Sequence, residues 1–230
     1  MVVRGPDLLW GGDIHRFHPL PGLFGGIIGG PPCQRFSRFR HLVQHNGYAL
    51  AENLIPEFER CIFEAQPSWF IMENVPDAPL PVVPGYAIHA QLYNNRWCGG
   101  VQNRLRRISF GTRSGLRLDI PGEVFASIDY ASAVCASGGI KPGIPSDPSA
   151  RLKYMGWKTR EAFEHIRRLQ GLPDSFELPP FTISGAIKAV GNGVPLPLGR
   201  AIAHAVYQAC CEVERNRSYA KPRQAPERLP

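Results

Sequence analysis

Residues 29–37 read Gly-Gly-Pro-Pro-Cys-Gln-Arg-Phe-Ser and follow a short apolar stretch at residues 23–28. The two prolines fix φ just before Cys33, and Gly29 and Gly30 let the backbone approach a ligand closely. A thiol held by stiff backbone at the end of a strand suits covalent catalysis, because a thiolate must be aimed before it attacks. The alternative is that Cys33 is a small buried apolar residue, the usual place of a free cysteine.

The chain around this loop is predicted to alternate between strands and helices. Residues 49–65 carry apolar side chains at steps of three and four, which indicates an amphipathic helix that Pro67 ends. Residues 69–72 form a compact apolar run typical of a buried strand. Residues 34–48 are basic and polar and are expected to form an exposed loop. The alternation of apolar strand and helix predicts βαβ layers around a parallel sheet.

The remaining segments give weaker local signals. Residues 113–150 are mixed in composition and predict no regular structure, and the basic, proline-containing tail at 216–230 is expected to be disordered. The other predicted elements are strands at 86–93 and 105–112, a loop at 76–85, a helix at 159–170 between an N-cap at Thr159 and Gly171, and a final helix at 196–213.

Composition limits the class of protein. The 230 residues are 43% hydrophobic and 20% charged, which suits one well-buried domain. No apolar run is long enough for a membrane span and the N-terminus has no hydrophobic signal core, so no membrane partner is expected. The six cysteines form no CxxC pair, so neither a disulfide framework nor a metal site is expected, and a cytoplasmic or nucleoid-associated location fits a free thiol. A net charge of +7 favours a polyanionic partner.

Several motifs follow in a fixed order and together resemble the DNA cytosine-5 methyltransferase family. They are the Cys33 loop at 29–37, Ile-Met-Glu-Asn-Val-Pro at 71–76, Gln-Asn-Arg-Leu-Arg at 102–106, the stretch from Thr-Arg-Glu-Ala to Leu-Gln-Gly-Leu-Pro-Asp at 159–174, and Gly-Asn-Gly-Val-Pro through Ala-Ile-Ala at 191–203. The resemblance implies a Rossmann-like α/β fold that uses S-adenosyl-L-methionine to methylate double-stranded DNA, as in restriction–modification.

The same resemblance implies roles for four catalytic residues. Cys33 would add to carbon 6 of a flipped cytosine, and Glu73 would hold the base and donate a proton as charge builds in the ring. Arg104 and Arg106 are two residues apart and would project to one face of an extended segment, Arg106 nearer the base. The alternatives are that Glu73 caps the following turn and that the arginines form a solvated edge.

The resemblance also implies residues that bind ligands. The cofactor residues would be Asp13 and Ile14 beside the adenine, Gly30 and Pro32 along the methionine moiety, and Leu54 and Asn192 by their spacing. In the loop that would cover DNA, Gln34, Ser37 and Arg38 are the expected contacts. Arg35, Arg38 and Arg40 are cationic residues that could lower the pKa of the Cys33 thiol.

Two departures from the family pattern matter. The glycine-rich strand and loop, Asp-Leu-Phe-x-Gly-x-Gly, with which family members begin is missing before Asp7, so the fold is expected to be incomplete at its N-terminus. The interval before Thr159 is short for a target-recognition region, which is expected to be small and irregular. The predicted division is a partial catalytic domain at 1–112, a recognition region at 113–175, a returning catalytic segment at 176–215, and the tail.

These departures leave several functional hypotheses open. The chain could be a working methyltransferase whose cofactor site is completed by a second polypeptide or by self-association. It could be an inactive truncated relative, or a non-catalytic DNA-binding subunit that needs a partner. One branch of the family modifies RNA, so a tRNA substrate is also open. A cysteine hydrolase using Cys33 is a further alternative, but none of the histidines stands in a recognisable arrangement with it.

Overall fold

A computed structural model describes residues 12–37, 40–45, 47, 49–122, 131–133, 160–179 and 181–219. The chain divides into two compact units. We call them the sheet unit, which comprises Met1–Arg96, Gln102–Arg117 and Tyr130–Ala133, and the helical unit, which comprises Trp97–Val101, Leu118–Asp129 and Val134–Pro230. Each unit is described by itself. The predicted four-part division of the chain stays a prediction.

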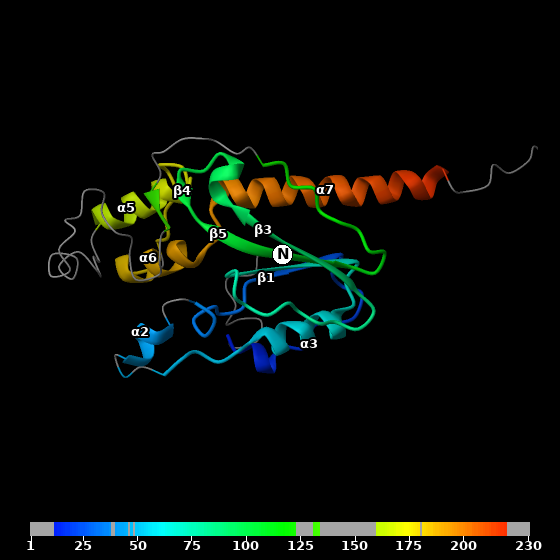
Figure 1. Cartoon of the computed structure of the whole chain (residues 1–230), viewed down its shortest axis with the longest axis horizontal. Coiled ribbons are helices and arrows are strands. Elements are labelled where there is room, and N and C mark those ends of the chain that lie inside the picture. Colours follow the sequence, from blue (N-terminus) through cyan, green and yellow to red (C-terminus); the bar gives the residue numbers. More distant parts are fainter. Residues whose placement is uncertain are drawn as a thin grey trace, which may run out of the picture. The chain divides into compact units, whose positions relative to one another are not determined.

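The sheet unit is built on a mixed sheet with the strand order β1-β2-β5-β3 (Figure 1). β1 (Gly26–Gly29) runs parallel to β2 (Trp69–Asn74), as the βαβ pattern predicted. β5 (Leu105–Thr112) is antiparallel to both β2 and β3 (Ala87–Asn94). The prediction of a parallel sheet is therefore wrong for β3 and β5. The chain between these strands is too short for the crossover that a parallel pair requires, so they pair as antiparallel neighbours.

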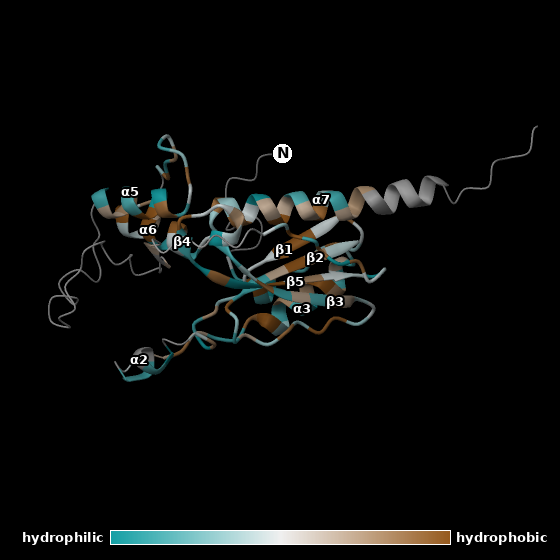
Figure 2. Cartoon of the chain, turned by 45° about the horizontal axis from the view of Figure 1, so that its top comes forward, coloured by the Kyte–Doolittle hydropathy of each residue, from teal (hydrophilic) through white to brown (hydrophobic). Residues whose placement is uncertain are grey.

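α3 (Ile55–Ala65) covers one face of this sheet (Figure 1), and the core of the sheet unit lies between the helix and the sheet. Phe58 and Ile62 of the helix pack with Phe70 and Met72 of β2, and the Phe58 and Phe70 rings meet edge to face at 5.8 Å. Figure 2 shows the apolar character of β1 and β2, the strands beside this layer. The helix predicted at 49–65 is thus confirmed in its C-terminal two thirds.

The boundaries of α3 have local causes. Pro56 occupies the first turn, where its missing N–H and fixed φ are tolerated, and the residues before it are not helical. Asn53 accepts a hydrogen bond from the Ile55 N–H through Oδ1 at 3.2 Å, which marks the same start. At the other end, Gln66 adopts a left-handed conformation with φ 51° and donates its N–H to the Ile62 carbonyl.

Gly29 is required by packing. A Cβ placed there would lie 2.5 Å from the Phe58 ring. We expect Gly29→Ala to lower the free energy of unfolding by about 1–3 kcal/mol, because the ring must leave a well-packed site. Denaturant unfolding with Gly25→Ala as the control measures this, since no atom lies within 4 Å of a Cβ at Gly25. Equal stability of the two variants would contradict this account of β1.

The other elements of the sheet unit and the junction are short. One of them, α2, lies in the segment that was predicted to be a loop, so that prediction is wrong for these residues. The elements are η1 (Ile14–Arg16), α2 (Arg40–His45), η2 (Asn95–Cys98), which crosses the boundary between the units, and β4 (Gln102–Asn103) paired in parallel with β6 (Ala131–Ser132).

The helical unit contains α5 (Arg160–Leu169), α6 (Ile183–Asn192) and α7 (Leu196–Tyr219). Phe163 and Ile166 of α5 pack with apolar residues of α6. The helix predicted at 159–170 is confirmed, and Gly171 ends it with φ +72°, although Thr159 lies outside the described residues. α7 continues to Tyr219, so the prediction that disorder begins at residue 216 is wrong.

α6 was not predicted. Thr182 caps its N-terminus by accepting the Gly185 N–H at 3.1 Å. Most of the irregular segment expected at 113–150 lies outside the described residues. Among the helices that the described ranges contain, none is both long enough and apolar enough to span a membrane.

Candidate functional site

Two strand ends meet at one edge of the sheet. β1 and β2 are parallel, so the Cys33 loop after β1 and Glu73 with Asn74 at the end of β2 lie at the same edge. Asn74 joins the two. Its Nδ2 donates to the Pro31 carbonyl at 3.1 Å, and its Oδ1 accepts the Val75 N–H at 2.9 Å. With 2% of its surface exposed, Asn74 fixes the loop rather than facing a ligand.

The Cys33 loop is closed by backbone hydrogen bonds. The Cys33 carbonyl accepts the N–H groups of Phe36 at 3.0 Å and Ser37 at 2.9 Å, which forms a tight turn directly after the prolines. Cys33 itself is a free thiol and half-buried. A half-buried thiol on a tied loop is accessible to a reactant and restrained in direction, which is the arrangement a covalent nucleophile needs.

Glu73 is paired with Arg106 at the end of β2. Arg106 Nε lies 2.7 Å from Glu73 Oε1, and each side chain is 15% exposed. The contact is a close ion pair in which Oε1 is removed from solvent. Burial raises the pKa of Glu73, and the charges of Arg106 and Arg104 offset only part of this effect.

Strand register explains why these side chains meet. Glu73 pairs with Ile108 across β2 and β5, so both point to one face of the sheet. Arg106 lies two residues before Ile108 and therefore shares that face. Arg104 precedes β5, is 3% exposed, and acts on the same carboxyl. The structure thus brings Glu73, Arg104 and Arg106 together.

Gly30 lies against the same carboxyl. A Cβ at Gly30 would sit 3.4 Å from Glu73 Oε2, an ordinary contact distance, so Gly30 and the carboxyl are close neighbours. Pro32, next in the loop, is exposed. Gly30, Pro32, Cys33 and Glu73 therefore share one edge of the sheet unit.

The other proposed cofactor residues lie elsewhere. Asp13 is exposed and caps η1 by accepting the His15 N–H at 3.0 Å, and Ile14 is half-buried. Leu54 is the half-buried N-cap of α3. Asn192 is the exposed last residue of α6, in the helical unit, so the structure does not join it to the others.

The proposed DNA contacts lie in the turn after Cys33. Gln34 is exposed and Ser37 is half-buried, while Arg38 lies outside the described residues. Of the neighbouring arginines, Arg35 is exposed and Arg40 lies 3.3 Å from His41 through its Nε. The role of these cations toward the Cys33 thiol stays a prediction.

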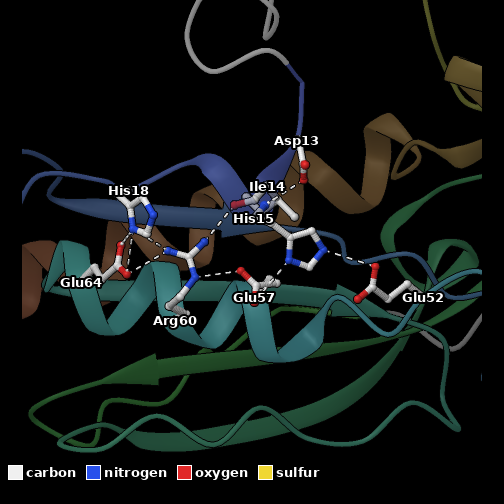
Figure 3. Close-up of polar contacts among 8 residues, drawn as sticks. All are labelled: Asp13, Ile14, His15, His18, Glu52, Glu57, Arg60 and Glu64. Carbon is white, nitrogen blue, oxygen red and sulfur yellow. Dashed lines mark hydrogen bonds and ion pairs between the residues drawn. The ribbon is translucent and has the colours of Figure 1, made fainter.

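The sequence analysis missed a polar cluster around Arg60 of α3 (Figure 3). Arg60 forms ion pairs with Glu57 at 2.8 Å and Glu64 at 2.9 Å and donates to the Ile14 carbonyl at 2.9 Å. Steps of three and four residues from Glu57 to Arg60 and from Arg60 to Glu64 predict one helix face, and this spacing was the available signal. The contact with Ile14 could not be predicted, because it joins residues 46 positions apart.

In the helical unit, Gln170 forms hydrogen bonds with the segment that follows α6. Its Nε2 donates to the Gly193 carbonyl at 3.2 Å and also to that of Val190, and its own carbonyl accepts the Leu196 N–H at 2.8 Å. Gln170 is 2% exposed. It therefore holds the Gly-Asn-Gly-Val-Pro segment between α6 and α7 in one shape.

Comparison with known proteins finds similarity to one family over part of the chain. A family model described as C-5 cytosine-specific DNA methylase matches residues 11–78, which include Asp13, Cys33 and Glu73. The Type II methyltransferase M.HgiDI of Herpetosiphon aurantiacus is 35% identical over 104 residues, covering 41% of this chain and 33% of that protein. M.HgiGI of the same organism is 46% identical over 54 residues, covering 24% and 40%.

The solved structures support the fold. The Entamoeba histolytica methyltransferase EhMeth superposes with a TM-score of 0.53 at 13% identity, over 80% of this chain and 77% of that one. At this identity the likeness shows the fold alone, and it confirms the predicted α/β methyltransferase architecture. The chain spans well under half the length of the curated relatives it matches. The matched family model and the relatives agree in kind, and over residues 11–78 the chain is similar to the C-5 cytosine-specific DNA methylases.

Proposed function

We propose that this chain transfers a methyl group from S-adenosyl-L-methionine to carbon 5 of cytosine in double-stranded DNA, through a covalent bond to Cys33. One observation carries the proposal: the mostly buried carboxyl of Glu73, ion-paired with Arg106, lies at the sheet edge that also bears the Cys33 loop. A raised pKa keeps such a carboxyl ready to donate a proton to a base.

The chemistry assigns a bond to each group. Carbon 5 of cytosine is a poor nucleophile in the aromatic ring. The Cys33 thiolate bonds to carbon 6, and the electron pair of the 5,6 double bond moves to carbon 5 while Glu73 gives its proton to ring nitrogen 3. After methylation a base takes the proton from carbon 5, the double bond re-forms, the Cys33 thiolate leaves, and ring nitrogen 3 returns its proton to the Glu73 carboxylate. The ring cannot reach these groups inside a duplex, so the cytosine must flip out.

The arginines have supporting roles in this proposal. Arg106 is in ion-pair contact with Glu73 and holds the carboxyl at the sheet edge, and its remaining donors can reach the cytosine carbonyl oxygen. Arg104 is buried and adds a second positive charge near the same carboxyl. Both charges partly offset the effect of burial on Glu73, so the acid is still able to lose its proton to the base.

The residues of the sheet unit fit the cofactor. S-adenosyl-L-methionine supplies an electrophilic methyl group. Asp13 is exposed, and Oδ1 alone accepts the His15 N–H, so the carboxylate can still accept the adenine amine. Ile14 would lie against the adenine, and Gly30, a close neighbour of the Glu73 carboxyl, would lie along the methionine moiety. Pro32 and Leu54 complete the proposed set within the sheet unit, and a cofactor role for Asn192, which belongs to the helical unit, stays a prediction.

The proposed partner, duplex DNA, predicts strong salt dependence. We expect the logarithm of the association constant to fall linearly with the logarithm of salt concentration, by about 0.9 for each phosphate contacted. Arg35→Gln, in the exposed turn beside Gln34, should reduce this slope by about one. Arg160→Gln is the control, because its charge is already paired with Glu164 and Glu177. A binding constant that does not change with salt would contradict the proposed contact with DNA.

Methyl transfer tests the activity directly. The purified chain is incubated with duplex DNA and S-adenosyl-L-methionine carrying a labelled methyl group, and the DNA is digested to nucleosides. The proposal expects the label in 5-methyldeoxycytidine, and none when every cytosine of the duplex is already methylated at carbon 5. DNA binding without transfer would contradict catalysis by this chain and favour a non-catalytic DNA-binding subunit. Transfer that begins only with a second polypeptide, or that depends on self-association, would identify a shared cofactor site.

The names of the relatives bear on the biological process and the location of the proposed reaction. The printed names of the relatives from Herpetosiphon aurantiacus are those of Type II methyltransferases. We propose by analogy that the reaction serves restriction–modification in the cytoplasm or at the nucleoid. Transfer of label to a tRNA in preference to duplex DNA would contradict this assignment.

A further inference from the structure

Apart from Asp13 and Ile14, the residues of the polar cluster around Arg60 have no role in the methyl transfer proposed above. Figure 3 shows the guanidinium between the 13–18 segment and α3. The members of this cluster, called here the Arg60 cluster, are Asp13, Ile14, His15, His18, Glu52, Glu57, Arg60 and Glu64. All of them belong to the sheet unit.

Arg60 reaches four different partners with one planar group. Nη2 donates to the Ile14 carbonyl at 2.9 Å, Nε to Glu57 at 2.8 Å, and Nη1 to Glu64 at 2.9 Å, while Nη1 also lies 3.2 Å from His18 Nδ1. The two carboxylates lie on the same helix as Arg60 and hold its guanidinium in one orientation. The remaining nitrogen, Nη2, points away from the helix and donates to the Ile14 carbonyl, which belongs to a distant segment of the chain. Arg60 therefore connects α3 to η1.

Polar contacts, rather than apolar burial, hold η1 in place. No residue of η1 is buried. His15 Nε2 lies 3.3 Å from Glu52, and His15 Nδ1 lies 3.5 Å from Glu57. The His15 side chain is 42% exposed, Glu52 is 67% exposed and Glu57 is 22% exposed. The Arg60 contact is the less exposed of these links, since 25% of that side chain is accessible. The position of η1 on α3 thus depends strongly on Arg60.

The carbonyl that Arg60 holds is next to the proposed adenine contact. The Ile14 carbonyl also accepts the Phe17 N–H at 3.1 Å, and the Asp13 carbonyl accepts that of Arg16 at 3.1 Å, which together form the turn of η1. The Asp13 carboxylate caps this same turn through the His15 N–H. A shift of the Ile14 carbonyl would therefore move the backbone that sets the direction of the Asp13 carboxylate.

α3 is a firm base for this arrangement. Its opposite face carries Phe58 and Ile62, which lie in the core with β2. The segment after η1 is also tied to the helix, because the Gly22 N–H donates to the Ala65 carbonyl at 2.9 Å. A guanidinium anchored on such a helix can transmit a fixed position to the residues that it binds.

We infer that Arg60 is a positioning residue for cofactor recognition: it holds the Ile14 carbonyl so that the Asp13 carboxylate is aimed at the exocyclic amine of adenine. The inference rests on the proposed function, since it takes Asp13 as the adenine contact. Lysine cannot replace Arg60, because one ammonium group cannot reach a backbone carbonyl and two carboxylates in the planar geometry of a guanidinium.

The test compares two ligands that differ at the adenine amine. S-adenosylhomocysteine has the exocyclic amine, whose N–H can donate to the Asp13 carboxylate. S-inosylhomocysteine has a carbonyl in its place, and a carbonyl has no hydrogen to donate. Dissociation constants for both are measured by calorimetry for the wild-type chain and for Asp13→Asn, Arg60→Lys and Glu64→Gln. Glu64→Gln is the matched control, because it removes an ion pair of Arg60 and leaves the Ile14 carbonyl contact in place.

The wild-type chain should prefer the adenine ligand by about 10- to 100-fold, as a hydrogen bond to a charged group predicts. Asp13→Asn and Arg60→Lys should both lose most of this preference, and Glu64→Gln should keep it. Hydrogen exchange should show faster exchange of the Phe17 amide in Arg60→Lys, with the amides of α3 unchanged.

Every other outcome contradicts the inference, and the outcomes distinguish failure of the inference from failure of the proposed cofactor site. If Asp13→Asn loses the preference and Arg60→Lys keeps it, Arg60 does not position the contact, and the proposed function stands. If Arg60→Lys weakens both ligands equally, its role is stability alone. If the wild-type chain binds neither ligand, the inference fails together with the proposed cofactor site. Should Arg60→Lys fold poorly, unchanged exchange at Phe17 in Arg60→Gln would contradict the inference.

Discussion

Replacing Cys33 by serine is expected to reduce methyl transfer by at least about 10⁴-fold while leaving DNA affinity within a few-fold of wild type. The hydroxyl of serine is a far weaker nucleophile toward carbon 6 than a thiolate, and no carbanion at carbon 5 can form without this bond. The Cys33 loop should keep its shape, because its turn is closed by backbone hydrogen bonds to the Cys33 carbonyl. Initial rates of methyl transfer and equilibrium DNA binding measure the two effects separately.

The matched control is Cys211→Ser, which replaces another half-buried free thiol, on α7. It should transfer methyl groups at the wild-type rate. A Cys33→Ser variant that keeps more than a few per cent of the activity would contradict the covalent mechanism. Loss of activity in both variants would show sensitivity to thiols in general and would not support a special role for Cys33.

Replacing Glu73 by glutamine is expected to reduce the rate of methyl transfer by about 10²–10⁴-fold, the usual contribution of a positioned acid. Glutamine keeps the shape and can still donate a hydrogen bond, but it cannot transfer a proton to ring nitrogen 3. Because burial raises the pKa of Glu73, the wild-type rate should fall as pH rises through that pKa. The Glu73→Gln rate should lack this limb, and rate–pH profiles of both chains test the expectation.

The same pKa predicts an effect on stability. A carboxyl whose pKa is higher in the folded chain than in the unfolded chain binds its proton more tightly when folded. The stability that this supplies is fully present below the unfolded pKa, near 4.5, and is lost as pH rises through the folded one. The free energy of unfolding of the wild-type chain should therefore fall relative to Glu73→Gln over that range. A constant difference across pH would contradict the assigned burial effect.

The sequence predicted the part of the fold that local patterns determine. Apolar steps of three and four placed α3, and the compact run at Trp69 placed β2, so the parallel pair β1 and β2 followed, with the Cys33 loop and Glu73 at one edge of the sheet. The direction of β5 was predicted wrongly, because the alternation of strand and helix favoured parallel neighbours, whereas the short connection from β3 to β5 requires an antiparallel pair. α6 escaped prediction because its glycines and serine weaken local helix propensity, while packing against α5 stabilises it.

The candidate site divides in the same way. Cys33, Glu73 and Arg106 were predicted from motifs, and strand register then explains why Glu73 and Arg106 touch. Gly29 was expected to admit a ligand, yet the Phe58 ring already fills the space beside it. Arg60 was not singled out, because its partner is a backbone carbonyl, and a carbonyl leaves no signature in the sequence.

The covalent bond between Cys33 and cytosine is the central claim, and trapping it is the most direct measurement. Duplex DNA containing 5-fluorocytosine is incubated with the chain and S-adenosyl-L-methionine, because fluorine at carbon 5 cannot leave as a proton does and the thioether to carbon 6 persists. Mass spectrometry of the digested complex should find the nucleotide on the peptide that carries Cys33, and no complex with Cys33→Ser. Methylation of ordinary DNA by a chain that yields no such adduct, or an adduct on another cysteine, would contradict the account.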